Sequence, residues 1–556
     1  MSRRLAFALF VLFTLVWFGN LDYRHLIRPD EGRYAEIPRE MAASGDWVTP
    51  RLNGIKYFEK PPLQYWATAA AYRLFGEHEW TARLWTALTG WLGVVLAWFA
   101  GRRLFGEKAG LLAALVLASM SFYVLAGHLS SLDMGVSFFL ELALIAFLLA
   151  QTADTPAQER RFMLLAWAAA AFALLSKGLI GLVLPALTLI LYTLVTRQTT
   201  PWRRLHAAGG LALFFLIAAP WFIAVSLANP EFPRFFFIHE HFERFLTRVH
   251  GRYHPWYDYI PLLLLGSLPW LGSLFHALWR AFSAEKQGVG TGTVCPTAPA
   301  GLPLKPRLFL GLWVVVVMVF FSLSQSKLPG YILPVFPALA LLIGETLASA
   351  DTASARRQLW LGAAVAGLLA GAALFLFESH AAADPALYGR YGKWLAAGGI
   401  VMLIAFVVAD RLLRRRLNLA AFVTVASGGL LLAQAIVTGH ESLAPLNSGY
   451  DFARKLAPLL KATDRLYCLG MYDQTLPFYL KRTCILVDYE DEMRFGLDQE
   501  PALRGPQRAD FLAHFPAARD VVVILSPATY GELRDHLPHR LLVFDREHVA
   551  IAPPRP

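Results

Sequence analysis

The sequence has little charge for its length. Only 16% of its 556 residues are Asp, Glu, Lys or Arg, and 56% are hydrophobic, whereas a soluble globular protein has about a quarter charged residues. This balance excludes a soluble single-domain enzyme and a disordered chain. Cysteine is also scarce. Cys295, Cys468 and Cys484 form no CxxC pair, which argues against a disulfide scaffold or a zinc finger, although Cys468 and Cys484 could pair with each other.

Positive charge is in excess. The chain has 51 Lys and Arg against 40 Asp and Glu, a net charge of +11. No basic and aromatic module of the usual kinds accompanies this excess, so the sequence does not indicate nucleic acid as a partner. A membrane protein explains the excess more simply, because Lys and Arg concentrate in its cytoplasmic loops.

Long apolar runs recur through most of the chain. Residues 5–21 are long enough to cross a membrane, and no convincing cleavage site follows them, which predicts an uncleaved first span. Twelve further runs begin near Leu84, Leu111, Phe138, Phe162, Leu179, Leu211, Ile260, Leu308, Ile332, Leu359, Trp394 and Ala420. Alternate loops each hold at least two Lys or Arg. Thirteen spans, with a cytoplasmic N-terminus and an external C-terminus, satisfy this bias.

The segments expected outside the membrane differ in character. Loops 22–83 and 229–255 are the long ones, and the first carries amphipathic stretches that predict helices on the membrane surface. After residue 439, short β-rich runs alternate with polar helical stretches such as 450–462. The expected strands are Leu466–Met471, Thr483–Val487, Val521–Leu525 and Leu541–Phe544. The predicted fold is an α-helical polytopic membrane protein, with a transmembrane domain over 1–439 and a periplasmic α/β domain over 440–556.

One charged motif directly follows the first span. It reads Arg28-Pro29-Asp30-Glu31-Gly32-Arg33-Tyr34, and its Pro and Gly bend the chain into a turn that enters a helix. A carboxylate at such a turn can cap the free N–H groups of the helix. The alternative is a catalytic carboxylate that faces a cavity, because ionisable groups near the membrane often mark substrate sites.

Several cations lie on the outer side, where the charge bias disfavours them. Lys60 follows Glu59 in Tyr57-Phe-Glu-Lys-Pro-Pro-Leu63, and the pair could be a simple surface ion pair. Ser176-Lys177-Gly178 interrupts an apolar stretch and predicts a tight hairpin, and Arg244 and Lys327 lie in further outer loops. Isolated cations of this kind could merely snorkel. Together with carboxylates such as Asp133 they would instead suit a phosphate or diphosphate.

Two histidines lie near Arg244. With Glu59, His239 and His241 could bind a divalent metal. On an α-helix the two rings would point about 200° apart, so one helix offers only one of them easily. A lone interfacial histidine is also commonly just polar and solvated.

These motifs resemble those of a known family. The matching pieces include Arg28–Tyr34, Phe58–Leu63, Leu132-Asp-Met134, Glu240–Phe245 and Phe321–Tyr331. They are similar to the bacterial 4-amino-4-deoxy-L-arabinose (aminoarabinose) transferases of lipid A. That family belongs to the GT-C glycosyltransferases that use polyprenyl-phosphate sugars, and it is related to the protein O-mannosyltransferases.

The resemblance implies an activity and site roles. The sugar would move from undecaprenyl phosphate to a lipid A phosphate at the periplasmic face of the bacterial inner membrane, with resistance to polymyxin and other cationic antimicrobial peptides as the consequence. The expected catalytic residues are Asp30, Asp133 and Glu31. Those expected at the donor phosphate are Lys60, Lys177, Arg244, Arg33, Tyr57, Lys327 and Tyr331. Glu59, His239 and His241 are expected at a divalent metal, with zinc as the candidate.

Alternative functions remain open. A polyprenyl-phosphate-sugar glycosyltransferase with another sugar or a protein acceptor would carry much the same motifs. A lipid-linked sugar transporter would need polar residues at mid-span depth. The ionisable residues of this chain instead gather on one side of the membrane, which favours a reaction at a surface. A scaffold would leave Lys177 and Asp133 without a purpose.

Overall fold

A computed structural model describes residues 3–243, 255–283, 304–378 and 384–554. The chain divides into two compact units. The helical unit comprises Met1–Phe18 and Thr86–Gly439, and the α/β unit comprises Gly19–Trp85 and His440–Pro556. The division at residue 440 coincides with the predicted domain boundary. The first long loop, expected within the 1–439 domain, instead clusters with the C-terminal part.

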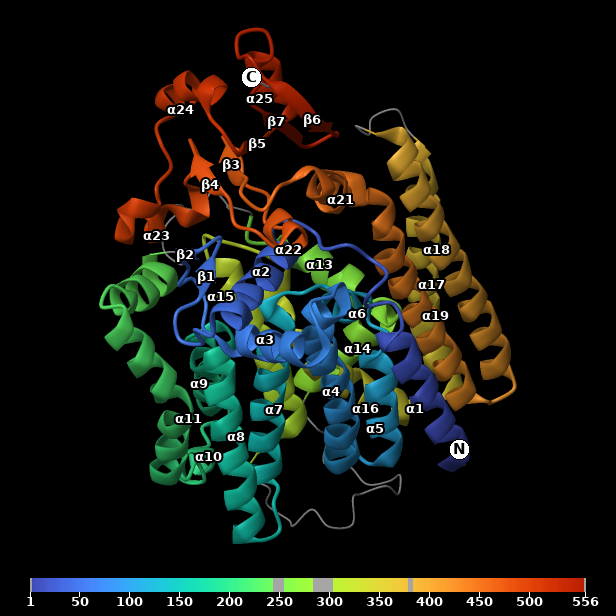
Figure 1. Cartoon of the computed structure of the whole chain (residues 1–556). Coiled ribbons are helices and arrows are strands. Elements are labelled where there is room, and N and C mark those ends of the chain that lie inside the picture. Colours follow the sequence, from blue (N-terminus) through green and yellow to red (C-terminus); the bar gives the residue numbers. More distant parts are fainter. Residues whose placement is uncertain (1–2, 244–254, 284–303, 379–383, 555–556) are drawn as a thin grey trace. The chain divides into compact units, whose positions relative to one another are not determined.

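The helical unit is built from long apolar helices, several of which run side by side (Figure 1). Each of the thirteen apolar runs in the sequence falls on a helix or, in one case, on a bent pair of helices. These elements are α1 (Arg3–Phe18), α4 (Glu79–Phe105), α5 (Glu107–Leu117), α7 (Leu132–Gln151), α8 (Pro156–Lys177), α9 (Ile180–Thr196), α11 (Ala207–Ala228), α13 (Tyr259–Gly266) with α14 (Leu271–Phe282), α15 (Pro306–Leu323), α16 (Val335–Ser349), α17 (Thr352–Glu378), α18 (Pro385–Arg414) and α19 (Asn418–Gly439).

Length and composition alone qualify fewer of these helices as membrane spans. Six of the described helices are long and apolar enough, and the pair α13 and α14, bent by 112°, makes a seventh. Three shorter apolar helices, Phe7–Phe18, Ile180–Thr196 and Val335–Ser349, fall below the length of a full span. Shorter elements between the long helices are α6 (Ser121–Ala126), α10 (Thr200–Arg203), the π-helix η1 (Arg234–Glu243) and the 3₁₀-helix η2 (Pro329–Ile332).

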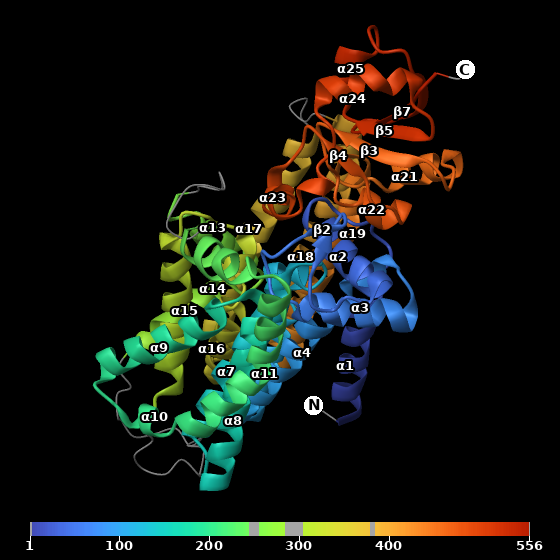
Figure 2. The same ribbon diagram turned by 60° about the vertical axis from the view of Figure 1, so that its left-hand side comes forward.

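Small residues let the helices of this unit approach one another closely. Where α4 meets α5, a Cβ added to Gly101 would lie 2.8 Å from the Cα of Gly110. Both backbones would have to move apart to accept it. Close approach at glycine is typical of helix packing in membranes, where burial from water does not drive association. The α8 helix packs against both α7 and α11 (Figure 2).

A five-stranded mixed sheet forms the core of the α/β unit. Its strand order is β4-β3-β5-β7-β6, with β3 parallel to β4 and β5, and β7 antiparallel to β5 and β6. The strands are β3 (Arg465–Leu469), β4 (Ile485–Val487), β5 (Val521–Leu525), β6 (Arg540–Phe544) and β7 (Val549–Ala552). Each of the four predicted strands is present, and β7 is a further strand that the sequence did not predict.

Helices surround this sheet and complete the unit. Phe511 and Phe515 pack with Leu469, Val523 and other apolar residues of the strands in one buried cluster. The regular elements of the C-terminal part are η3 (His440–Leu443), α20 (Ala444–Asn447), α21 (Tyr450–Leu456), η4 (Ala457–Leu459), α22 (Leu476–Leu480), η5 (Asp491–Met493), α23 (Arg494–Gln499), η6 (Pro501–Leu503), α24 (Arg508–His514), η7 (Phe515–Ala517) and α25 (Pro527–Leu533).

The first loop joins this unit through side-chain bonds to the C-terminal part. It contains α2 (Asp30–Ser44), the short strands β1 (Arg51–Leu52) and β2 (Ile55–Lys56), and α3 (Leu63–Phe75). The amide of Asn53 donates to the carbonyl of Cys484 at 2.7 Å and accepts from its N–H at 2.8 Å. Arg51 binds Glu500 through two bonds of 2.9 and 3.0 Å. Such paired bonds satisfy buried polar groups on both segments and hold them together.

The two cysteines of the α/β unit are buried free thiols. The structure therefore lacks the disulfide between Cys468 and Cys484 that their position made conceivable. Cys468 lies within β3, and Cys484 directly precedes β4, the strand that pairs with β3 in the sheet. Burial, together with the nearby Cys468, raises the pKa of the Cys484 thiol, which keeps it protonated.

Candidate active site

Asp30 is the first residue of α2. The residue before it, Pro29, is the N-cap position, and no side chain caps the helix there. The carboxylate of Asp30 accepts a hydrogen bond from Nη1 of Arg33 at 2.9 Å, one turn further along the helix, and its side chain is 54% exposed. The capping alternative is therefore not found. Asp30 presents an oriented and accessible carboxylate.

Glu31, the next residue, has the opposite environment. Its side chain is buried between Arg24 and Arg83, with guanidinium-to-carboxylate distances of 2.7 and 2.8 Å, and it also accepts from the N–H of Ile27. Burial by itself would raise the pKa of this carboxyl, but the two arginines outweigh burial and hold the pKa well below its usual range. The structure gives Glu31 an anchoring environment, and its expected catalytic role stays a prediction. Its carboxylate is fully engaged in anchoring the chain.

Arg33 is buried and lies between two carboxylates. Its Nη2 lies 2.5 Å from Oε2 of Glu492, while Nη1 binds Asp30. Its guanidinium is 5.9 Å from the ring centroids of both Tyr34 and Tyr57. Burial would lower the pKa of Arg33, yet the neighbouring Tyr57 and Glu492 raise it, so the side chain stays charged. Its hydrogen bonds to Asp30 and its ion pair with Glu492 indicate that Arg33 orients the carboxylate.

Tyr57, Glu59 and Lys60 lie between β2 and α3. Tyr57 is 2% exposed, and burial raises the pKa of its hydroxyl. The ammonium of Lys60 donates to the backbone carbonyl of Glu59 at 2.7 Å and lies 3.9 Å from the carboxylate of the same residue. The ion pair between Glu59 and Lys60 that the sequence suggested is therefore present, but its charged atoms are 3.9 Å apart. Lys60 is partly exposed, and its ammonium has three N–H donors, so it can bind further acceptors.

The helical unit holds a second group of the expected residues. Asp133, in the first turn of α7, forms an ion pair with Lys177, the last residue of α8. The ammonium of Lys177 lies 4.6 Å from the ring centroid of Tyr331, which places a cation over an aromatic face. Three residues from distant parts of the sequence thus form one cluster, with both charged side chains mostly buried.

Two glycines shape this second cluster. The predicted hairpin is confirmed: α8 ends at Lys177, Gly178 has a φ of +92°, and α9 begins at Ile180. A positive φ favours glycine, which has no Cβ to clash. At Gly330, an added Cβ would lie 2.4 Å from the carboxylate of Asp133. Glycine at this position leaves room for the acid beside η2.

Lys327 has a different surrounding from Lys60 and Lys177. It is 6% exposed, and its ammonium donates to the backbone carbonyl of Ser324 at 2.5 Å. A buried ammonium that binds its own loop stabilises the turn between α15 and η2. The structure therefore gives Lys327 a loop-bracing contact, and its expected role at the donor phosphate stays a prediction.

The expected metal ligands form no site in the described residues. Nowhere in the described ranges do three or more His, Cys, Asp or Glu side chains group in a way that could hold a metal ion. The ring of His239 is partly buried and stacks on Phe235 at a centroid distance of 5.2 Å. Arg244 and the side chain of His241 lie outside the described residues. The expected role of Glu59, His239 and His241 at a metal therefore stays a prediction, and we derive no step through one.

Eight of the thirteen predicted site residues thus fall into two clusters. The Asp30 cluster (Asp30, Arg33, Tyr57, Glu59, Lys60) lies in the α/β unit, and the Lys177 cluster (Asp133, Lys177, Tyr331) lies in the helical unit. Sequence reasoning missed Glu492, which contacts Arg33, as well as Arg24 and Arg83, which hold Glu31. Glu492 lies in an ordinary polar stretch 459 residues after Arg33, so no pattern marks it.

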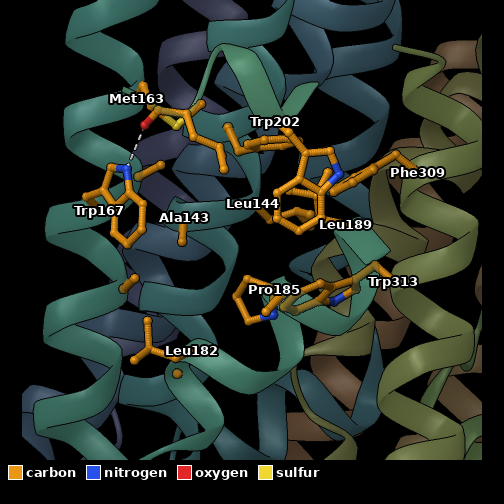
Figure 3. A pocket seen from close by; sticks show the side chains of 16 residues that line it. Ala143, Leu144, Met163, Trp167, Leu182, Pro185, Leu189, Trp202, Phe309 and Trp313 are labelled. Carbon is orange, nitrogen blue, oxygen red and sulfur yellow. Dashed lines mark hydrogen bonds between the residues drawn. The ribbon is translucent and has the colours of Figure 1, made fainter. Parts of the chain in front are cut away.

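A separate cavity in the helical unit is apolar. It has a volume of about 200 Å³ and lies among α7, α8, α9, α10 and α15. Three tryptophans, Trp167, Trp202 and Trp313, line it together with aliphatic side chains (Figure 3). The indole N–H of Trp167 donates to the carbonyl of Leu205 at 2.8 Å. Because its lining lacks an acid or a base, this cavity suits hydrocarbon rather than the reacting groups.

Comparison with known proteins matches both parts of the chain. Residues 2–236 match the dolichyl-phosphate-mannose-protein mannosyltransferase family, and residues 452–553 match the aminoarabinose transferase C-terminal domain. The crystal structure of ArnT from Cupriavidus metallidurans bound to undecaprenyl phosphate is similar over 100% of both chains, with 39% identity and a TM-score of 0.91. An archaeal oligosaccharyltransferase, AglB from Archaeoglobus fulgidus, shares only the fold, with 13% identity and a TM-score of 0.50 over 94% of this chain and 69% of that one.

Curated relatives show the same similarity in sequence. The undecaprenyl phosphate-α-4-amino-4-deoxy-L-arabinose arabinosyl transferase of Aeromonas hydrophila is 31% identical over 525 residues, which cover 92% of this chain and 91% of the relative. The protein of the same name from Pseudomonas aeruginosa (strain UCBPP-PA14) is 36% identical over 355 residues, 62% of this chain, and the match spans 60% of the relative's length. The fold is thus that of a polytopic membrane protein of GT-C type with a C-terminal α/β part, as predicted. The chain belongs to the family of undecaprenyl phosphate-α-4-amino-4-deoxy-L-arabinose arabinosyl transferases.

Proposed function

We propose that the protein transfers 4-amino-4-deoxy-L-arabinose from undecaprenyl phosphate to a phosphate of lipid A. The observation that carries this proposal is the similarity to named arabinosyl transferases along almost the whole chain. The accessible carboxylate of Asp30, oriented by Arg33 at the start of α2, supports it, because a half-exposed acid beside a cation is suited to act on a bound substrate.

In the proposed reaction the bond between C1 of the sugar and the phosphate oxygen of the donor breaks. An oxygen of the acceptor phosphate forms the new bond to C1, and undecaprenyl phosphate leaves with the electron pair. A phosphate monoester has a second pKa near 6 and is largely ionised at neutral pH, so the acceptor needs no strong base. We propose that Asp30 orients the acceptor or offsets positive charge that develops on the sugar. The ammonium of Lys60 would stabilise charge on the leaving phosphate.

The proposed location is the bacterial inner membrane, with a cytoplasmic N-terminus and a periplasmic C-terminus. The Lys and Arg pairs in alternate loops support this orientation. Polymyxin resistance would follow from the modified lipid A, because the added amine reduces its negative charge. A role for zinc at Glu59, His239 and His241 stays a prediction.

Mass spectrometry of lipid A tests the proposal. Cells that lack the protein should show lipid A without aminoarabinose, and cells that express it should gain the mass of one or more such sugars. An Asp30→Asn variant should lose this gain and the associated polymyxin resistance, while the purified variant still binds undecaprenyl phosphate. Unmodified lipid A together with a glycosylated protein would favour a protein acceptor. An unchanged phenotype with Asp30→Asn would remove Asp30 from the reaction.

A further inference from the structure

The turn that carries Asp30 meets one short segment of the C-terminal part through two direct contacts and a third that runs through Glu492. That segment is Asp473-Gln474-Thr475, between β3 and α22, and we call it the 473–475 segment. All the contacts lie within the α/β unit. They concern Arg28, Gly32 and Arg33, which surround Asp30 in the sequence.

The first contact is at Arg28, two residues before Asp30. Its Nη2 donates to Glu547 at 2.6 Å and to the carbonyl of Leu446 at 2.8 Å, and its Nη1 lies 3.8 Å from the carboxylate of Asp473. Asp473 is itself fixed. It is fully buried, it binds His548 at 2.9 Å, and it accepts from both the N–H and the hydroxyl of Thr475. Arg28 therefore meets a rigid group of acceptors.

The second contact is between backbones. A Cβ added to Gly32 would lie 2.5 Å from the carbonyl carbon of Gln474 and 2.7 Å from the N–H nitrogen of Thr475. Only glycine lets the first turn of α2 approach this segment so closely. The sequence motif contains glycine at this position, directly between Glu31 and Arg33.

The third contact runs through side chains. The amide of Gln474 donates to Oε1 of Glu492 at 2.5 Å, and Oε2 of Glu492 lies 2.5 Å from Nη2 of Arg33. The other nitrogen of the same guanidinium, Nη1, holds Asp30 at 2.9 Å. The guanidinium is planar and rigid, so the ion pair with Glu492 on one nitrogen restricts where the other nitrogen can hold the carboxylate of Asp30.

We propose that the 473–475 segment positions the Asp30 carboxylate for the reaction, with Glu492 and Glu547 as positioning residues that act through Arg33 and Arg28. This inference rests on the proposed role of Asp30. It gives the C-terminal part of the chain a role in turnover. A displacement of about 1 Å at a reacting group can lower a rate by roughly 100-fold. Loss of the contacts that Glu492 and Glu547 make with the two arginines should therefore lower kcat.

The test compares two variants with a matched control. Glu492→Gln keeps the shape of the side chain and removes its charge beside Arg33, and Glu547→Gln does the same beside Arg28. Glu532→Gln is the control, because Glu532 makes a 3.0 Å ion pair with Arg508 in the same unit and both side chains are exposed. For each purified, folded protein we would measure kcat, KM for the donor, thermal stability, and binding of undecaprenyl phosphate.

We expect kcat per folded molecule to fall roughly 10- to 100-fold in Glu492→Gln and less in Glu547→Gln. Binding of undecaprenyl phosphate should stay within about twofold in both, and Glu532→Gln should match the unmodified enzyme. As a conservative rescue, Glu547→Asp should recover part of the kcat lost in Glu547→Gln, since it restores a carboxylate for Arg28.

Other outcomes overturn the inference. Unchanged kcat in both variants, together with an inactive Asp30→Asn, would refute the positioning role of Glu492 and Glu547 and leave the proposed function intact. Loss of undecaprenyl phosphate binding in Glu492→Gln would make Glu492 a ligand contact instead. Failure of both variants to fold would make these residues purely structural. An active Asp30→Asn would instead refute the proposed role of Asp30, whatever the two glutamates do.

Discussion

The Asp30 cluster and the Lys177 cluster hold charged residues in different ways. Around Asp30, the guanidinium of Arg33 lies between carboxylates from both ends of the chain, Asp30 three residues before it and Glu492 in the C-terminal part. At Lys177, one ion pair forms where two neighbouring helices begin and end, beside an aromatic ring and a glycine. The first arrangement depends on a folded α/β unit. The second depends mainly on a hairpin between apolar helices.

This difference has a physical reason. Charged side chains in the α/β unit can share several hydrogen-bonding partners, so networks form and each member orients the next. In the helical unit the partners available are few, since most side chains there are apolar. A charged residue is then tolerated where it meets one opposite charge at a helix end. If this contrast is right, substitutions in the two clusters should differ in their effects on turnover and on stability.

The largest effect is expected for Asp30→Asn. Its side chain is half exposed and has one described partner, so the folded state should tolerate the change. Turnover should fall roughly 100- to 1,000-fold, because a charge aimed at the reacting groups is lost. A steady-state assay of sugar transfer, with undecaprenyl phosphate binding as the control, checks this. Loss of binding equal to the loss of turnover would contradict it.

The neighbouring substitution Glu31→Gln should act on stability instead. It removes the negative charge between two buried arginines, and breaking a buried ion pair costs about 3–5 kcal/mol. We expect a lower yield of folded protein and a lower Tm in detergent. The molecules that do fold should retain kcat within a few-fold. A stable but inactive Glu31→Gln variant would instead support a catalytic role for Glu31.

Alkaline pH should weaken the α/β unit before the helical unit. His548 is buried against Asp473 and Asp545. Burial would lower its pKa, but these two acids raise the pKa to about 9. Because the pKa of His548 is higher in the folded state, the protonated ring stabilises the folded unit fully below the pKa of the unfolded chain, near 6.5. This stabilisation, roughly 1–3 kcal/mol, is lost as the pH rises through 9. Hydrogen exchange at pH 7 and pH 9 measures this unit by unit. A His548→Gln variant should lack the pH effect, and equal loss in both units would argue against it.

The smallest effect is expected at the Lys177 cluster. Removal of one partner in Asp133→Asn or Lys177→Met leaves the other charge mostly buried, whereas the double variant removes both charges. A double-mutant cycle should give a coupling free energy of roughly 0.5–3 kcal/mol. Thermal unfolding of the four proteins provides it. Gly330→Ala should mimic the single variants in part, because its Cβ would press on Asp133. Additive effects would mean that the ion pair contributes nothing measurable.

Sequence patterns predicted much of the fold. Apolar runs and the positions of Lys and Arg located each of the thirteen helical segments, because both depend on the bilayer as a solvent. Strands β3 to β6 were found from local β-rich composition. The packing of the first loop against the C-terminal part could not be predicted from the sequence. Asn53 and Cys484 are 431 residues apart, and no sequence pattern indicates their contact.

The site was predictable in kind but not in detail. The motif from Arg28 to Tyr34 indicated a functional carboxylate, yet it could not distinguish Asp30 from Glu31, which are adjacent and chemically alike. Their roles diverge because α2 turns one side chain toward solvent and the other toward Arg24 and Arg83. Likewise, Lys177 and Lys327 look equivalent in sequence, but Lys177 forms an ion pair with Asp133 of another helix, and Lys327 donates to a backbone carbonyl of its own loop.

By itself, then, the sequence determined that this chain is a membrane protein, and its motifs predicted a site for a phosphate-linked sugar, because solvent preference and motif chemistry are local properties. Tertiary structure alone decided which carboxylate is exposed and which one anchors the chain. It also decided that Gln474 and Glu492 lie beside the Asp30 turn. Those assignments depend on which distant side chain fills the space next to each charge, and only the folded backbone brings such partners within hydrogen-bonding distance.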